Sequence, residues 1–304
     1  MNTQNVYPLL LTLITLVWNL TTWAQSIAFS FDDGPVMATQ AGMSAAARNT
    51  AILKQLADAN VKTVLFLTLQ DSRVARLNLV RQWGVEGHSI GNHTITHPNF
   101  HNPKITLSDY QREVEQCDSV ISAMPGYTKL FRFTFLKEGN TIEKRDGFRR
   151  FLKTIHYRPA PVSIDASDWY YNARLLDWLK KNPGRDLTPY RDAYLSHLWS
   201  RAIFYDSVSQ VVLGRSVKHV LLLHHNQINA LFLKDIIAMF RTNGWNIIDP
   251  GTAFSDSVYS IEPNILPAGD SILLQIAKAK GEKSLRYPGE DEVYEKPILD
   301  KLGL

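Results

Sequence analysis

Residues 26–35 read SIAFSFDDGP, a β-rich apolar run that stops at two aspartates, a glycine and a proline. Gly and Pro end strands abruptly, so the run predicts a short strand over Ser26–Phe31 with Asp32 and Asp33 at its carboxyl end. Adjacent side chains of a strand point in opposite directions. One carboxylate is therefore free to bind a metal ion while the other serves as a base. Taken alone, the same residues also suit an ordinary Asp-Gly-Pro turn.

Apolar runs and helical patterns alternate along the chain downstream of this stretch. Strands are predicted at the end of Gly84–Ile90 and over Val61–Leu69, Leu130–Phe135, Ala160–Ile164, His219–Leu223 and Trp245–Ile248. Helices are predicted over Ala41–Ala59, Arg73–Trp83, Leu107–Met124, Glu143–Thr154, Tyr170–Lys181, Asp192–Val212 and Phe232–Asn243. This alternation predicts an α/β fold with a parallel sheet or barrel, whose active site lies at the carboxyl ends of the strands. The polar residues at those ends are Asp32, Asp33, His93, Arg132, Asp165, Asp168 and His224.

The two ends of the chain depart from this pattern. Residues 1–24 contain the apolar run LLLTLITLVW, which is short for a membrane span and typical of a secretory signal peptide cleaved after Ala24. Because the segment before this run has no Lys or Arg, an uncleaved anchor or a buried first helix is the alternative. Residues 25–253 are expected to form the main domain, and residues 254–304 a C-terminal extension with one short helix near Ser271–Ala279. We therefore expect a secreted or periplasmic protein that is not stably inserted in a membrane after cleavage.

Composition narrows the function classes. The 304 residues carry a formal charge of +4, and the Lys and Arg residues are scattered along the chain. The sequence has no basic stripe, so nucleic-acid binding is not predicted. The lone cysteine, Cys117, cannot form an intramolecular disulfide and lies in an amphipathic helical pattern, where it is expected to be a small buried side chain.

A second motif, GHSIGNHTITHP, contains His93 and His97. The two are four positions apart, so one helical turn would place both imidazoles on the same face. Such a pair commonly holds one divalent metal ion, and a carboxylate as third ligand suits zinc or another borderline metal.

Together these motifs resemble those of the polysaccharide deacetylase family, also called the NodB-homology family or carbohydrate esterase family 4. The first family motif, [T/S]-F-D-D-G-P, is matched by residues 30–35, and the second, H-[S/T]-x-x-H, by residues 93–97. The resemblance extends from about Ile27 to Asp249. It implies a distorted (β/α) barrel of about seven parallel strands, the NodB-like domain, over residues 25–253.

Three later family motifs are also present. Residues 132–135, RFTF, match R-x-P-[Y/F] except that Thr134 replaces the proline. Residues 165–169 read DASDW and residues 222–224 read LLH, with His225 where the family often has Asp. A threonine lacks the fixed φ of proline, so the turn after Arg132 is expected to be looser. His224 is preferred over His225 as the functional imidazole because it directly follows the apolar strand.

The resemblance implies a role for each matching residue. One divalent ion, zinc by default with cobalt, nickel or manganese as alternatives, is expected on Asp33, His93 and His97. Asp32 is the expected base, paired with Arg132, and His224 the expected acid, oriented by Asp168. The backbone N–H of Phe135 would bind the oxyanion, while Trp169 and Leu222 would line the sugar groove.

The implied activity is hydrolysis of acetyl groups from N-acetylated amino sugars of a polysaccharide or oligosaccharide, with release of acetate. Two alternatives stay open. The same residues suit an O-acetyl esterase acting on a decorated polysaccharide, and an inactive relative that binds glycans in the cell envelope would share the fold. The partner is an acetylated glycan in each case, and neither its identity nor the oligomeric state is encoded in a recognisable pattern.

Overall fold

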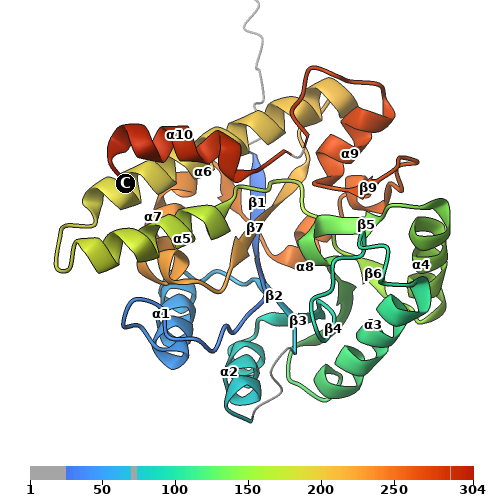
Figure 1. Cartoon of the computed structure of the whole chain (residues 1–304), viewed down its shortest axis with the longest axis horizontal. Helices are drawn as coiled ribbons and strands as arrows, with labels where there is room; N and C mark the ends of the chain where they lie inside the picture. The colour runs from blue at the N-terminus through green and yellow to red at the C-terminus, as the bar shows by residue number, and fades with distance from the viewer. Residues whose placement is uncertain (1–24, 70–73, 288) are drawn as a thin grey trace, which may run out of the picture.

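The computed structural model describes residues 25–69, 74–287 and 289–304, so the expected signal segment lies outside the described residues. A seven-stranded parallel sheet runs through the centre of these ranges, in the order β6-β4-β3-β2-β1-β7, with β8 beside the start of β1 (Figure 1). The strands are β1 (Ser26–Asp32), β2 (Val64–Leu67), β3 (Ser89–Asn92), β4 (Tyr127–Phe131), β6 (Arg158–Pro159), β7 (Lys218–His224) and β8 (Asn246–Ile247).

Helices surround this sheet and connect its strands (Figure 1). They are α1 (Ala45–Asp58), α2 (Val74–Val85), α3 (Leu107–Ile121), α4 (Ile142–Thr154), α5 (Asp168–Lys181), α6 (Thr188–Leu213) and α7 (Gln227–Thr242), followed by α8 (Pro250–Phe254), α9 (Ile272–Ala279) and α10 (Glu292–Leu302). Several begin at a residue whose hydroxyl accepts a backbone N–H of the first turn: Ser44 before α1, Thr106 before α3 and Thr141 before α4. Such caps satisfy donors that a helix start otherwise leaves unpaired.

The segment between β6 and α5 turns the sheet into a distorted barrel. Ile164 forms a parallel bridge with Leu221 of β7, and its N–H donates to the carbonyl of Val220. The N–H of Leu222 donates in turn to the carbonyl of Ile164. The chain that leaves β6 at one edge of the sheet therefore reaches β7 at the other edge. This arrangement confirms the predicted α/β class and the NodB-like barrel.

The register places the carboxyl ends of the strands at one rim. Asp32 at the end of β1 lies opposite Phe66 of β2 and His224 of β7. Asn92 at the end of β3 lies opposite Leu67 and Phe131. The loops that follow β1, β3, β4 and β7 therefore meet at this rim, as in other parallel barrels.

Three local predictions at the rim were wrong. The strand expected over Leu130–Phe135 ends at Phe131 and is followed by a 3-10 turn, Thr134–Leu136, in which Phe135 has a φ of 54°. The strand expected over Ala160–Ile164 is missing apart from the bridge at Ile164, and the two-residue strand β6 ends just before it. The segment His93–His97 is a loop and not a helical turn, because Thr94 and His97 have left-handed φ values of 69° and 57°.

The segment after α8 contains more structure than expected. The predicted helix near Ser271–Ala279 is α9, but α10 was missed because Pro297 lies inside it and lacks the N–H that would continue the hydrogen-bond ladder. Leu273 and Leu274 of α9 are fully buried in the main hydrophobic core. A short strand, β9 (Ala268–Gly269), pairs with β5 (Lys137–Gly139). The domain boundary at residue 253 stays a prediction. Among the described helices, none has the length and apolar character needed to cross a bilayer.

Candidate active site

A cavity of about 530 Å³ opens at the rim where the strand ends meet. Most of the residues singled out in the sequence line it: Asp32, Asp33, His93, His97, Phe135, Trp169, Leu222 and His224. Arg132 and Asp168 are buried behind this wall and contact it through Asp32 and His224. The structure therefore brings all ten predicted residues into one site, although they come from five separate stretches of chain.

Asp33, His93 and His97 converge on one point of the cavity. The Asp33 carboxylate oxygen Oδ1 lies 3.0 Å from Nε2 of His97 and 3.3 Å from Nε2 of His93. Asp33 follows β1 with a left-handed φ of 63°, which turns its side chain away from that of Asp32. The two histidines reach the same point from the loop after β3, since its left-handed residues bend the backbone around the cavity.

The hydrogen bonding of this triad suits a cation. The carbonyl of Arg132 can only accept, so Nδ1 of His93, 2.8 Å away, donates to it and Nε2 is the ring nitrogen left to bind an ion. Asp33 Oδ1 is buried and receives no hydrogen bond. One ligand atom from each of Asp33, His93 and His97 lies within 4.8 Å of the others. Electron pairs that face one another without a proton donor are stabilised by a bound metal ion, so the residues fit the expected metal.

Asp32 has a different environment from Asp33. Nη1 of Arg132 donates to both of its carboxylate oxygens, at 3.3 Å and 3.2 Å. Arg132 is itself fixed, because Nη2 donates to Ser30 Oγ and Nε donates to the carbonyl of Ala160. The guanidinium also lies over the Phe66 ring, 4.4 Å from its centroid. The Arg132 guanidinium therefore holds the Asp32 carboxylate in place and balances its charge, while Asp32 still lines the cavity.

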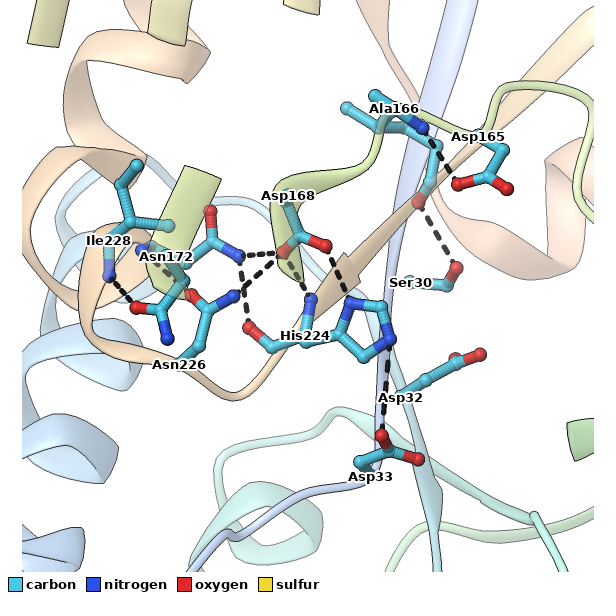
Figure 2. A network of polar contacts seen from close by, with 12 residues as sticks. Ser30, Asp32, Asp33, Asp165, Ala166, Asp168, Asn172, His224, Asn226 and Ile228 are labelled. Carbon is cyan, nitrogen blue, oxygen red and sulfur yellow. Dashed lines mark hydrogen bonds and ion pairs between the residues drawn. The ribbon is translucent and has the colours of Figure 1, made fainter. Parts of the chain in front are cut away.

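His224 is tied to Asp168, as Figure 2 shows. Nδ1 of His224 donates to Asp168 Oδ1 at 2.5 Å, and the His224 backbone N–H donates to Oδ2 at 2.8 Å. The amides of Asn226 and Asn229 also donate to Oδ2, so the Asp168 carboxylate is saturated. Burial alone would lower the pKa of His224, but the negative charge of Asp168 outweighs it and raises the pKa to about 10. The ring directs Nε2 into the cavity, 4.0 Å from Asp33 Oδ2.

The neighbouring His225 points away from the cavity. Its ring is fully buried, and its Nε2 lies 3.2 Å from the side-chain oxygen of Asn49. It packs behind the DDGP turn so closely that a Cβ on Gly34 would lie 2.6 Å from the His225 Cβ. Burial lowers the pKa of His225 to about 3, so the ring is neutral. Of the two imidazoles, His224 is the one that can contact a ligand.

Two aromatic rings border the cavity. The Phe135 ring is 54% exposed and meets the His97 ring edge-to-face, with centroids 4.4 Å apart. Trp169 is 46% exposed and lies at the start of α5, next to Asp168. Leu222 contributes an apolar surface from β7. Exposed aromatic faces beside a polar centre are typical of sites that hold a sugar ring.

The sequence did not identify the part of the wall that follows the barrel. Asp270, Glu290 and Asp291 line the cavity from this segment, and Lys137 and the predicted strand-end residue Asp165 lie beside them. Burial and the charge of Asp270 raise the pKa of Asp165 to about 6. Asp270, Glu290 and Asp291 follow no predicted strand, so no periodic signal connects them to the rim. Only the acidic run 290–292, EDE, stands out in the sequence.

Sequence comparison finds relatives of the first half of this chain. A family model described as polysaccharide deacetylase matches residues 19–149. A peptidoglycan-N-acetylglucosamine deacetylase of Bacillus cereus is 31% identical over 143 residues, which make up 47% of this chain and 46% of the relative. Over these residues the chain is similar to polysaccharide deacetylases. The aligned part spans about half the length of that curated relative, and the residues that match the family model include both the DDGP and the HTITH motifs.

Solved structures of this family share the fold. The catalytic domain of a peptidoglycan N-acetylglucosamine deacetylase from Eubacterium rectale superposes with a TM-score of 0.53 at 17% identity, covering 76% of this chain and 90% of that one. A family 4 pseudoenzyme from Bacillus anthracis gives the same TM-score at 13% identity, covering 76% of this chain and 65% of that one. Because a pseudoenzyme has this architecture too, the fold alone does not establish catalytic turnover. Turnover depends on the individual residues of the site.

Proposed function

We propose that this protein is a metal-dependent hydrolase that removes acetyl groups from N-acetylated amino sugars of a glycan and releases acetate. The observation that carries the proposal is that His93 and His97 converge on Oδ1 of Asp33, a buried carboxylate oxygen that receives no hydrogen bond. Two further groups, Asp32 held by Arg132 and His224 held by Asp168, open onto the same cavity. A metal-type triad flanked by one candidate base and one candidate acid suits hydrolysis of an amide.

The triad would hold one divalent ion through Asp33 Oδ1 and Nε2 of each histidine. Zinc is the ion we expect for two imidazoles and one carboxylate, with cobalt, nickel or manganese as alternatives. An ion bound there polarises an acyl oxygen and lowers the pKa of a bound water. Because Nδ1 of His93 is engaged by the Arg132 carbonyl, the ring cannot turn away from this position.

Asp32 is the proposed base. Its carboxylate lies beside the triad, with Oδ2 3.8 Å from Nε2 of His93, and is oriented by Arg132. It accepts the proton of the attacking water, and the buried guanidinium limits the ways in which the carboxylate can rotate. The split between Asp33 as ligand and Asp32 as base follows from their different surroundings.

His224 is the proposed acid. Asp168 keeps its ring protonated on Nδ1, and the raised pKa of His224 keeps the second proton on Nε2, ready for the leaving nitrogen. The N–H of Phe135 is the proposed donor to the developing oxyanion. Trp169, the Phe135 ring and Leu222 are the proposed contacts to the sugar.

Peptidoglycan is the first glycan to test, because the Bacillus cereus relative is named for it. That choice fits a protein exported by residues 1–24 and acting outside the cytoplasm in the cell envelope, which we propose on the signal-like composition of the segment. An O-acetyl ester would use the same groups, and the Bacillus anthracis pseudoenzyme motivates the alternative of glycan binding without turnover.

The deciding experiment is an acetate-release screen of the zinc-loaded chain. The substrates are peptidoglycan, N-acetylglucosamine oligomers and O-acetylated xylan, each with and without a chelator, and the Asp32→Asn variant is the matched control. We expect chelator-sensitive acetate release from an N-acetylated substrate and almost none from the variant. Release from xylan alone would make the protein an esterase. Glycan binding without acetate release from any substrate would make it a binding protein.

A further inference from the structure

We propose that Tyr110 and Thr134 are positioning residues: a buried hydroxyl pair that fixes the turn carrying Phe135 against the loop carrying His97. The inference deepens the proposed function and rests on it, because the two segments supply the proposed oxyanion donor and one of the proposed metal ligands. Neither hydroxyl lines the cavity. Both side chains are fully buried behind it.

Three hydrogen bonds connect these segments, and their directions follow from one fixed acceptor. The carbonyl of Pro98 can only accept, so the Thr134 hydroxyl, 2.5 Å away, donates to it. The same hydroxyl must then accept from the Tyr110 hydroxyl at 2.8 Å. The Tyr110 oxygen accepts in turn from the Thr134 backbone N–H at 3.2 Å. Every donor is used once, so the arrangement is complete without water.

The hydrogen bond between Thr134 and Pro98 joins two residues that are each next to a left-handed site residue. Pro98 directly follows His97, whose left-handed φ of 57° aims the ring at Asp33. Thr134 directly precedes Phe135, which is also left-handed at 54°. Left-handed non-glycine residues persist only where surrounding contacts hold them. The Thr134–Pro98 bond and the edge-to-face contact of Phe135 with His97 join the two strained positions at both backbone and side chain.

Tyr110 is a rigid support for this link. It lies on α3, and its ring stacks on Phe100 with centroids 4.1 Å apart, while Phe131 and Phe148 meet it edge-on. These rings form a small hydrophobic cluster separate from the main core. Burial raises the pKa of Tyr110, so the hydroxyl keeps its proton over the whole assay range. A ring held on several sides presents its hydroxyl in one place, which is what a positioning group requires.

Thr134 therefore does not loosen the turn, contrary to the expectation from the sequence. A proline at this position would restrain φ locally but would have neither an N–H for Tyr110 nor a hydroxyl for Pro98. The chain replaces a local restraint with a tertiary one. The tertiary restraint also reaches the His97 loop, which a proline ring would not bind.

The first test is independent of activity and uses the metal-free chain. Amide hydrogen exchange is measured for peptides covering residues 95–100 and 132–137 in the wild type, Tyr110→Phe and Thr134→Val. Both substitutions keep side-chain shape and remove one hydroxyl. Tyr127→Phe is the matched control, since it removes the hydroxyl that donates to Asp118, away from the cavity. We expect both peptides to exchange faster in the two variants than in the wild type, and at the wild-type rate in the control. Unchanged exchange would overturn the proposal.

The second test uses the zinc-loaded full chain and an N-acetylglucosamine oligomer. We expect Tyr110→Phe and Thr134→Val each to lower kcat by about ten- to a hundredfold, with KM within about twofold and one metal per chain retained, because small misplacements of reacting groups cost rates of this order. The double variant should be no slower than the slower single variant, because both act through one link.

The kinetic outcomes separate the inference from the function. Wild-type kcat in both single variants, or losses that multiply in the double variant, would overturn the positioning role. If the wild-type chain releases no acetate, the proposed function fails, and the exchange result alone decides whether the two loops are linked.

Discussion

Two groups of histidine and carboxylate side chains bring ligand atoms within 4.8 Å of one another in the described ranges of the chain. The rim group consists of Asp33, His93 and His97, and the α10 group consists of His197, Glu290 and Glu295. The rim group is formed by loops and faces the cavity. The α10 group is buried where the C-terminal segment packs against α6. Both groups combine histidine and carboxylate ligand atoms, but they differ in the positively charged side chains around them.

The α10 group already contains its cations. Nη2 of Arg201 lies 2.5 Å from Glu290 Oε1, and Nη2 of Arg286 lies 3.4 Å from Glu290 and 3.8 Å from Glu295. His197 donates through Nε2 to the carbonyl of Ala166, and its Nδ1 faces Glu295 at 3.1 Å. Arginine guanidinium groups therefore already lie against both carboxylates of this group. At the rim, the nearby Arg132 is engaged by Asp32, and the His224 ring approaches Asp33 only from the side of Oδ2, at 4.0 Å, so no arginine or lysine lies against Oδ1. Convergent ligand atoms indicate a metal site only where no arginine or lysine already lies against them.

The largest expected effect separates the two groups directly. His97→Ala should lower metal content from one ion per chain to nearly none and acetate release by about a thousandfold or more, because the ion supplies most of the electrostatic stabilisation. His197→Ala should keep one ion per chain. Atomic absorption on both purified variants, together with the acetate assay, checks this. Loss of metal from the His197 variant would show that the comparison is wrong.

The next effect sharpens the division within the rim. Asp32→Asn should retain the ion and lose activity by about a hundred- to ten-thousandfold, the range for removal of a general base. The amide is nearly isosteric, so the contact with Arg132 is weakened without opening a cavity. Metal analysis and single-turnover acetate release measure the two properties separately. Near-wild-type turnover would rule out Asp32 as the base.

A stability effect is expected from the α10 group. Glu295→Gln should lower the free energy of unfolding by about 2–4 kcal/mol, because it removes the buried carboxylate that faces Nδ1 of His197 and the half-buried guanidinium of Arg286. Glu292→Gln, an exposed change on the same helix, is the control and should have little effect. Urea denaturation measures both, and metal content should not change in either. Equal stabilities for the two variants would mean that the buried network contributes no more than surface charge.

The smallest effect concerns a partly exposed ion pair beside α8. Burial would raise the pKa of Asp256, but hydrogen bonds from Arg215 and from the N–H groups of Val258 and Lys218 outweigh it and lower the pKa to about 2. The folded state thus binds this proton less readily than the unfolded chain. The contribution is complete above about pH 4 and is lost as the pH falls towards 2.

Asp256→Asn should therefore be less stable than the wild type by about 1–2 kcal/mol at pH 6, a value reduced for the exposure of Arg215. The difference should narrow steadily below about pH 4. Urea denaturation at several pH values checks the trend. A constant difference across that range would assign the effect to packing and not to charge.

The sequence predicted the features that depend on local patterns. The DDGP turn ends β1 because Gly and Pro cannot continue it, and the apolar run before His224 forms β7 as expected. Parallel strands end at one rim, so polar residues at successive strand ends had to meet there. The family motifs then identified which of those residues form the site.

The features that it did not predict are set by tertiary contacts. The left-handed φ values of Thr94, His97 and Phe135 have no local signature, because non-glycine residues adopt them only under restraint from elsewhere. The restraint on Phe135 includes the Tyr110 hydroxyl, which is distant in sequence. The α10 helix was hidden by Pro297, whose cost is offset by the burial of Leu299 and Glu295 on its inner face.

The walls of the cavity have separate origins along the chain, and this has an evolutionary consequence. The metal triad, Asp32 and Arg132 lie within the stretch that matches the family model, whereas Asp270 and Asp291 lie far outside it. The proposed acid His224 and its partner Asp168 also follow the matched stretch, but they come from β7 and α5 and not from the C-terminal segment. For the proposed hydrolase, substitutions at Asp270 or Asp291 would alter which sugars fit without replacing a metal ligand, the base or the acid. Descendants of this chain could then change their glycan while keeping their chemistry.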